Sequence, residues 1–76
     1  MTELLTYIAK SLVDNPDDIV VTSRVAGNET VLELRANKSD MGKVIGRGGR
    51  IAREIRTVVR AAGARRGLNV TVDILD

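Results

Sequence analysis

Apolar residues along the chain follow two spacings, one helical and one extended. In the first segment they recur every three or four positions, at Leu5, Ile8, Ala9, Leu12 and Val13. This spacing predicts an amphipathic helix. Thr2 is the expected N-cap, with Glu3 in the first turn, where the helix dipole favours an acid. We expect the helix to end at Asn15, because the residue before Pro16 disfavours helical angles.

Three segments have the β-branched composition of strands. They are residues 18–26, 30–36 and 69–75. Gly27 and Asn28 form a turn signal between the first two, so a hairpin is expected there. In the second strand, apolar residues alternate with Glu33 and Arg35, which predicts one buried face. The last strand has its apolar residues on one face, at Val70, Val72 and Ile74.

Two helices are expected between the second and third strands. Ser39 is the expected N-cap of a short helix over about residues 40–45, and a longer helix runs over about residues 50–64. Gly67 follows the longer helix as its C-terminal stop. Its predicted buried stripe consists of Ile51, Ile55, Val58 and Ala62. Three arginines fall together on the opposite side, at Arg53, Arg56 and Arg60.

The predicted order of elements is therefore α-β-β-α-α-β. Two helices join the second and third strands, so these strands should run parallel through a right-handed crossover. The expected fold is α+β, a three-stranded mixed sheet with helices packed on one face. A chain of 76 residues has room for one domain, so residues 1–76 are expected to form a single domain.

Composition argues against catalysis. The chain has no cysteine and no histidine, which excludes thiolate metal sites, disulfides and every Ser-His or Cys-His arrangement. No paired carboxylates suggest acid-base chemistry, so we expect neither an enzyme nor a metal or other cofactor. The start of the chain lacks the features of a secretory signal, and no run of about 18 apolar residues occurs. A cytoplasmic protein without membrane insertion is expected.

Charge is distributed unevenly along the chain. The formal net charge is only +2, but residues 37–68 hold nine basic residues against Asp40 and Glu54. Residues 1–36 hold three basic residues against six acidic ones. A cationic third of the chain points to a polyanionic partner.

Within the cationic segment, three glycines interrupt the helical pattern at Gly46, Gly48 and Gly49. Glycine inside an element is destabilising, but in a turn it reaches backbone angles that other residues avoid. A helix beginning after this turn would direct unpaired N–H groups and a positive dipole end toward it. A phosphate there would be stabilised by those groups and by nearby cations, at Lys43, Arg47 and Arg50. The alternative is an ordinary helix-helix turn, for which one glycine would suffice.

The segment GKVIGRGGRIAREI, residues 42–55, resembles the signature of the KH domain, in which a GxxG loop joins two helices. The GxxG positions here are Gly46, Arg47, Gly48 and Gly49. The order of elements resembles the type II, bacterial version of that fold. The whole chain, including LVDNP at residues 12–16, is similar to small single-domain bacterial KH proteins of the KhpA type.

This resemblance implies a non-enzymatic protein that binds about four nucleotides of single-stranded RNA, with the GxxG loop clamping the RNA backbone. It further implies an RNA chaperone or post-transcriptional regulator linked to cell shape and cell-wall biogenesis. Such proteins act as a homodimer or with a larger KH-containing protein. The RNA-binding residues expected here are Lys43, Ile45, Gly46, Arg47, Gly48, Gly49, Arg50 and Arg53.

Two alternatives stay open at the level of sequence. The chain could be a protein-interaction module whose basic region is incidental, or its natural ligand could be single-stranded DNA. The chain has no Trp or Phe, and Tyr7 is far from the loop in sequence. Aromatic stacking platforms are therefore excluded, and base contacts must come from aliphatic and hydrogen-bonding groups. Weak affinity and loose specificity are expected for one such module.

Overall fold

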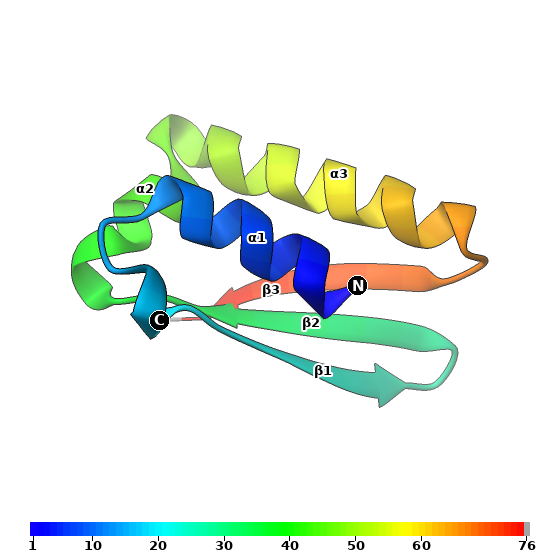
Figure 1. The fold of residues 1–76 in the computed structure, drawn as a ribbon. Coiled ribbons are helices and arrows are strands. Elements are labelled where there is room, and N and C mark those ends of the chain that lie inside the picture. The colour runs from blue at the N-terminus through cyan, green and yellow to red at the C-terminus, as the bar shows by residue number, and fades with distance from the viewer. Residues whose placement is uncertain (76) are drawn as a thin grey trace.

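A computed structural model describes residues 1–75 and contains, over that range, three α-helices on one face of a three-stranded sheet (Figure 1). The helices and strands are α1 (Thr2–Leu12), β1 (Val20–Ala26), β2 (Glu29–Arg35), α2 (Met41–Ile45), α3 (Arg50–Arg65) and β3 (Asn69–Leu75). Short 3-10 turns occupy Pro16–Asp18, Lys38–Asp40 and Arg47–Gly49. The predicted α+β class and order of elements are confirmed.

The sheet has the order β1-β2-β3 and is mixed, as predicted. β1 pairs antiparallel with β2, with Val21 opposite Leu34, and β2 pairs parallel with β3, with Leu32 opposite Val72. A turn at residues 27–28 joins β1 to β2. Both β1 and β3 are edge strands. The loop between α2 and α3 lies at the end of the molecule opposite the hairpin turn (Figure 1).

The core lies between the sheet and the helices. α1 contributes Leu5 and Ala9, which are completely buried. The other buried members of the cluster come from residue 19, from β2 and β3 and from α3, namely Ile19, Leu32, Leu34, Val70, Val72, Ile55 and Val59. Leu32 and Leu34 come from the face of β2 predicted to be buried. Val70 and Val72 are buried and Ile74 packs against the cluster, which confirms the predicted apolar face of β3.

The predicted bounds of the first helix were wrong at both ends. Met1, not Thr2, is the N-cap, and the hydroxyl of Thr2 donates to its neighbour Glu3 instead of capping the helix. The helix ends at Leu12, so Val13 is already extended. The reason for the early end is tertiary, because two backbone N–H groups just beyond Val13 donate to a carboxylate of another segment.

The predicted start of β1 and the cap of the short helix also need correction. Residues 16–18 form a 3-10 turn, and the strand begins only at Val20. Ser39 caps no helix. Instead, the side chain of Asn37 accepts a hydrogen bond from the Ser39 backbone N–H at 2.9 Å, and its oxygen also accepts one from the Ser39 hydroxyl at 2.8 Å. An Asn at the start of such a turn competes well for this role.

The buried stripe of α3 differs from the predicted one. Val58 is 50% exposed, and Ile51 and Ala62 are only partly buried. The residues that face the sheet are Ala52, Ile55, Val59 and Gly63. The helix approaches β3 so closely that a Cβ on Gly63 would lie 2.5 Å from Cγ2 of Val70. Small residues are therefore needed on the side of α3 that faces β3. The larger apolar residues Ile51 and Val58 face α1 instead.

The close approach of α3 to β3 can be tested with a double-mutant cycle. Gly63→Ala should lower the free energy of unfolding by about 1–3 kcal/mol, because the added methyl overpacks a filled core. Val70→Ala should also be destabilising, since it leaves a cavity. In the double variant, the loss of unfolding free energy measured by urea denaturation should be smaller than the sum of the two single losses, by about 0.5–3 kcal/mol.

Gly42→Ala is the matched control for Gly63→Ala. A Cβ on Gly42 would meet nothing within 4 Å, and its φ is not in the positive region. This variant should be neutral or more stable by about 0.4–1 kcal/mol. Additive effects of Gly63→Ala and Val70→Ala would contradict the packing described for α3.

Candidate nucleic-acid interface

Three of the four residues in the loop between α2 and α3 have positive φ angles, and Arg47 is the exception. The angles are +76° at Gly46, +63° at Gly48 and +76° at Gly49. Residues that have a Cβ rarely adopt such φ angles. An ordinary helix-helix turn would need one such residue, whereas this loop uses three. The conformation thus accounts for the glycine cluster that the sequence displays.

Gly46 and Gly48 differ in what surrounds them. A Cβ on Gly46 would lie 2.8 Å from Cβ of Ile51 and 2.9 Å from its backbone nitrogen, so this glycine is required by packing. A Cβ on Gly48 would meet nothing within 4 Å. The backbone at Gly48 is therefore open to another molecule, while the backbone at Gly46 is closed by the protein itself.

The N-terminus of α3 faces this loop. Gly49 is the N-cap residue, and no side chain forms a capping hydrogen bond. The backbone N–H of Gly49 donates to the carbonyl of Gly46 at 3.1 Å, which holds the turn closed. The helix has 16 residues, so the positive end of its dipole lies beside the loop. This arrangement favours an anion next to Gly48.

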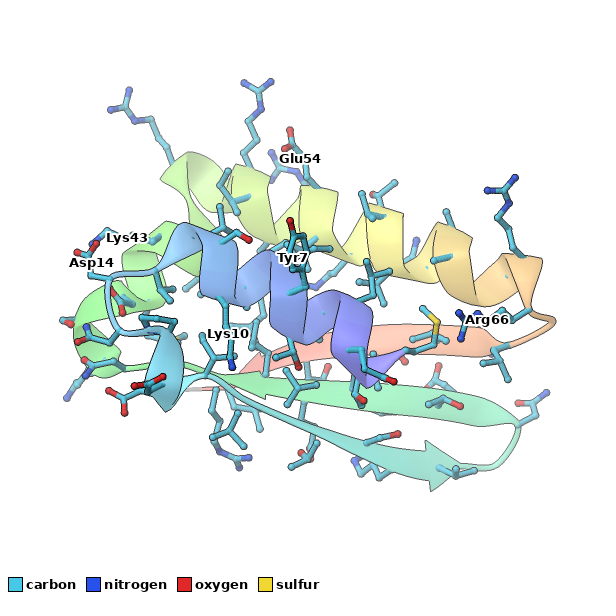
Figure 2. All side chains as sticks on the ribbon, in the orientation of Figure 1. Tyr7, Lys10, Asp14, Lys43, Glu54 and Arg66 are labelled. Atoms are coloured by element: carbon cyan, nitrogen blue, oxygen red, sulfur yellow. The ribbon has the colours of Figure 1, made fainter. Side chains whose placement is uncertain are left out.

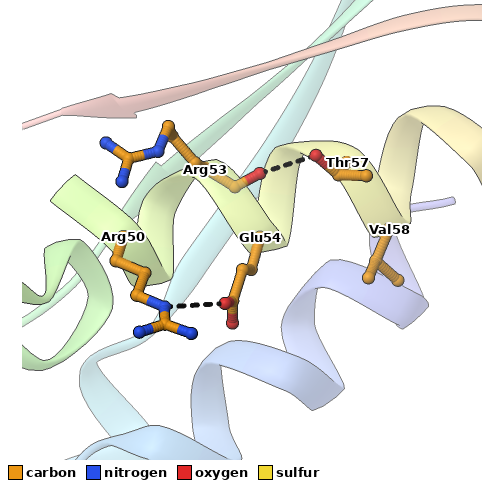
Figure 3. A pocket seen from close by; sticks show the side chains of 5 residues that line it. All are labelled: Arg50, Arg53, Glu54, Thr57 and Val58. Atoms are coloured by element: carbon orange, nitrogen blue, oxygen red, sulfur yellow. Dashed lines mark hydrogen bonds and ion pairs between the residues drawn. The ribbon is translucent and has the colours of Figure 1, made fainter.

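Three predicted arginines lie at the loop and have different partners. The side chain of Arg47 is exposed and makes no hydrogen bond or ion pair within residues 1–75. Nε of Arg50 lies 3.2 Å from Oε1 of Glu54, and Nη1 of Arg53 donates to the carbonyl of Gly48 at 2.8 Å. Figure 3 shows Arg50 and Arg53 directed to different sides of α3, around a shallow hollow. Arg53 thus holds the loop, and Arg47 has its charge available.

The ammonium group of Lys43 contacts two carboxylates. Its Nζ lies 2.7 Å from Oδ2 of Asp14 and 3.5 Å from Oδ1 of Asp40. Figure 2 shows Lys43 and Asp14 together at the end of α1. The hydrogen bond to Asp14 raises the pKa of Lys43 above its usual value; desolvation opposes this shift, and the charges of the two carboxylates add to it. The structure gives Lys43 an anchoring contact that the sequence prediction did not foresee.

Asp40 connects α2 to the segment after α1. Its side chain is 1% exposed and accepts hydrogen bonds from the backbone N–H groups of Asp14 and Asn15, at 3.3 and 3.0 Å, and from the Asn15 amide at 3.0 Å. Burial by itself raises the pKa of Asp40, but these hydrogen bonds and the charge of Lys43 outweigh it, so the pKa lies below its usual value. Asp40 thereby fixes the position of α2 and of the loop that follows.

The two isoleucines beside the loop have separate environments. Ile45, the last residue of α2, is 37% exposed next to Gly46, so it is available to a ligand. Ile51 packs against the core and against Gly46. Ile51 also lines an apolar groove of about 350 Å³ between α1 and α3, whose other lining residues are Ile8, Leu12, Glu54, Ile55 and Val58.

One contact at this surface was missed by the sequence prediction. Nε of Arg56 donates to the backbone carbonyl of Val72 at 3.3 Å, which connects α3 to the outer strand β3. Helical spacing places Arg53 and Arg60 on the same flank of α3 as Arg56. The helical wheel groups these three arginines, but periodicity could not show that Arg56 contacts β3.

Comparison with known protein families agrees with this fold. A family model described as KhpA/KhpB, KH domain, matches residues 2–74. The chain belongs to this family. Its three helices and three-stranded mixed sheet, in the order described above, are consistent with a type II KH fold. No helix within residues 1–75 has both the length and the apolar character to cross a membrane.

Two curated relatives match this chain over nearly their whole length. The RNA-binding protein KhpA of Clostridium perfringens is 49% identical over 75 residues, which cover 99% of this chain and 100% of that protein. The RNA-binding protein KhpA of Streptomyces coelicolor is 50% identical over 76 residues, which cover 100% of this chain and 92% of that protein.

Among solved structures, the fold resembles part of a larger protein. Era of Aquifex aeolicus, bound to GDP and aluminium fluoride, matches with a TM-score of 0.67 and 20% identity over 96% of this chain. The chain spans 28% of that Era chain. This likeness shows that the chain and that part of Era have the same fold.

The Asp40 contacts predict how stability depends on pH. A carboxyl whose pKa is lower in the folded state stabilises the protein above its unfolded pKa, about 3.9, and loses this effect as the pH falls through the folded pKa. Asp40→Asn should therefore be less stable than the parent chain at pH 7. The difference should shrink below about pH 4, as measured by urea denaturation at each pH.

Asp17→Asn is the control for this measurement. Asp17 is exposed and makes no hydrogen bond or ion pair within residues 1–75. Its replacement should leave the pH dependence of stability unchanged. If the loss of stability in Asp40→Asn were the same at pH 7 and at about pH 2.5, the charge of Asp40 would not be its cause.

Proposed function

We propose that this KH domain is a non-enzymatic protein that binds single-stranded RNA, with residues 46–49 clamping the phosphate backbone. The observation that carries the proposal is the open backbone at Gly48, next to the N-terminus of α3, which has no side-chain cap, and to the charge of Arg47, which has no partner within residues 1–75. Membership in the KhpA/KhpB family supports it, as do relatives named RNA-binding proteins. A KH domain acts by binding about four backbone nucleotides.

The proposed contacts divide into three kinds. Gly48 and Gly49 bring the protein backbone close to phosphate, while Gly46 and Arg53 maintain the shape of the loop. Arg47 and Arg50 supply charge, and Arg50 would exchange its exposed partner Glu54 for a phosphate. Lys43 adds positive potential from its anchored position, and Ile45 offers an apolar contact to a base.

Such a site suits an RNA chaperone or post-transcriptional regulator. The described surface has no aromatic platform, so the affinity per domain should be low and exchange between RNAs fast. Family membership supports a cytoplasmic location and a role in cell shape and cell-wall biogenesis. These assignments rest on the family and not on the geometry of the loop.

The loop assignment can be tested with one double variant. Replacing Arg47 and Gly48 with aspartate should reduce RNA binding at least about tenfold, because two negative charges face the phosphates. The fold should persist, since neither added side chain meets the core and Asp tolerates a positive φ better than most residues. Fluorescence anisotropy with a labelled eight-nucleotide RNA measures the binding, and thermal denaturation reports folding.

The chain contains a matched control for this variant. Arg66 and Gly67 are the same dipeptide at the other end of α3, and Gly67 also has a positive φ with nothing within 4 Å of an added Cβ (Figure 2 labels Arg66). Replacing both with aspartate gives the same change in charge and a similar backbone strain. Equal loss of binding in the two variants would mean that only net charge matters, and unchanged binding in the loop variant would reject the loop as the site.

Salt and DNA titrations decide between the ligand classes. Binding through several phosphates should weaken steeply with salt, with a slope in log-log form of about −0.7 per phosphate for a single strand. A flat response would favour the protein-interaction reading. RNA and DNA of the same sequence should compete unequally if the 2′-hydroxyl is contacted, and equal affinity would favour single-stranded DNA as an equivalent ligand.

The groove between α1 and α3 favours a second, additional role in binding a protein. It is lined by apolar side chains, and Val58 at its rim is half exposed. The proposed occupant is another KH chain, either a second copy or a larger KH-containing protein.

Val58→Lys tests the groove. Lysine at this position can pair with Glu54 one turn earlier, so the helix should tolerate it. Self-association or association with the KH partner should be lost in analytical ultracentrifugation, while RNA binding by the loop is retained. The control is Val25→Lys, at a 75% exposed valine on the edge strand β1. The same loss in both variants would contradict a role of the groove.

A further inference from the structure

We propose that Arg56 is the residue through which this protein discriminates between bases, and that it favours guanine. This inference rests on the RNA binding proposed above and goes beyond the backbone clamp, which is indifferent to sequence. The observation behind it is the hydrogen bond from Nε of Arg56 to the carbonyl of Val72, on the open edge of the sheet.

The edge position of β3 makes this carbonyl available. Among the strands of residues 1–75, β3 pairs with β2 alone, so its other side presents backbone groups without a strand partner. Arg56 reaches across from α3 and satisfies one of them while its own side chain is half buried. The guanidinium is therefore held at the border between helix and strand.

The hydrogen bond also orients the guanidinium. It uses Nε and leaves the N–H groups on the two Nη atoms without a hydrogen-bond partner within residues 1–75. A guanidinium is planar and has its donors in a rigid fork. Because the stem of Arg56 is already ordered, less side-chain entropy is lost when this fork binds a ligand.

Arg56 lies where it could contact a base of an RNA whose phosphate is bound at the loop of residues 46–49. Arg53, one turn nearer the loop on the same flank, donates to the carbonyl of Gly48. A phosphate at Gly48 would thus leave the adjoining nucleotide beside the flank that Arg53 and Arg56 share. The positively charged row continues with Arg60, one further turn along α3.

The hydrogen-bonding groups of the guanidinium determine which base it binds best. A guanidinium binds best to two adjacent acceptors, which guanine presents at O6 and N7. It also offers a flat face for stacking, which single-stranded RNA commonly uses. The described surface has no Trp, Phe or His, and Tyr7 is exposed on α1, away from the loop (Figure 2). Arg56 is the planar group at the edge of β3 that is already held in place.

The test compares four RNAs with four proteins. The RNAs are eight-nucleotide uridine oligomers, either unchanged or with one central guanosine, adenosine or cytidine. The proteins are the parent chain, Arg56→Ala, Arg56→Lys and Arg60→Ala. The parent should bind the guanosine oligomer about fivefold or more tightly than the all-uridine one, in line with one bidentate contact. Arg56→Lys retains the charge and lacks the fork, so it should lose this preference while the salt dependence of binding stays the same.

Arg60→Ala serves as the matched control, because it removes the same charge from the same flank. It should leave the preference for guanosine intact, even where it weakens all four affinities alike. Arg56→Ala removes both the charge and the aliphatic part of the side chain, and it could therefore disturb folding. Arg56→Lys keeps both, so it gives a clear result even if the alanine variant is destabilised.

The outcomes separate this inference from the proposed function. If the parent binds all four oligomers equally, or if Arg56→Lys keeps the preference, Arg56 does not read the base and RNA binding still stands. If the parent binds none of the oligomers, the proposed RNA binding fails, and this inference fails with it.

Discussion

The close approach of α3 to β3 at Gly63 is the contact on which the arrangement of the surface depends. It fixes the rotation of α3 about its axis, because only small side chains fit between helix and strand at this point. With that rotation, Ile51 and Val58 turn toward α1 and line the apolar groove. Arg56 turns toward the opposite flank and reaches the edge of β3. One packing contact therefore separates an apolar side of the helix from a basic one.

The loop between α2 and α3 combines residues with structural tasks and residues that are open to a ligand. Gly46 is closed by Ile51, and Arg53 binds the loop carbonyl of Gly48, so both stabilise the turn. Asp40 holds α2 against the segment after α1. The open backbone of Gly48 is supported on both sides by these contacts. A rigid loop of this kind loses little entropy when it binds phosphate.

Much of the fold was predictable because periodicity reports which face of an element is buried. The six main elements, the parallel crossover and the positions of the glycine break followed from local patterns. The errors occurred where a distant group changed a local preference. The first helix stops early because Asp40 takes the N–H groups of Asp14 and Asn15, and Asn37 takes the role expected of Ser39. Lys43 also has contacts that no local pattern shows, since its Nζ lies near the carboxylates of Asp14 and Asp40.

The sequence by itself determined the class of fold, the position of the loop and the concentration of positive charge around it. These properties depend on backbone preference and on spacing, both of which are local. The tertiary structure alone decided which glycine is open, which cation is unpaired and which arginine reaches the edge of β3. Those features depend on how the helices, the loop and the sheet pack against one another, and no pattern within a single helix encodes that packing.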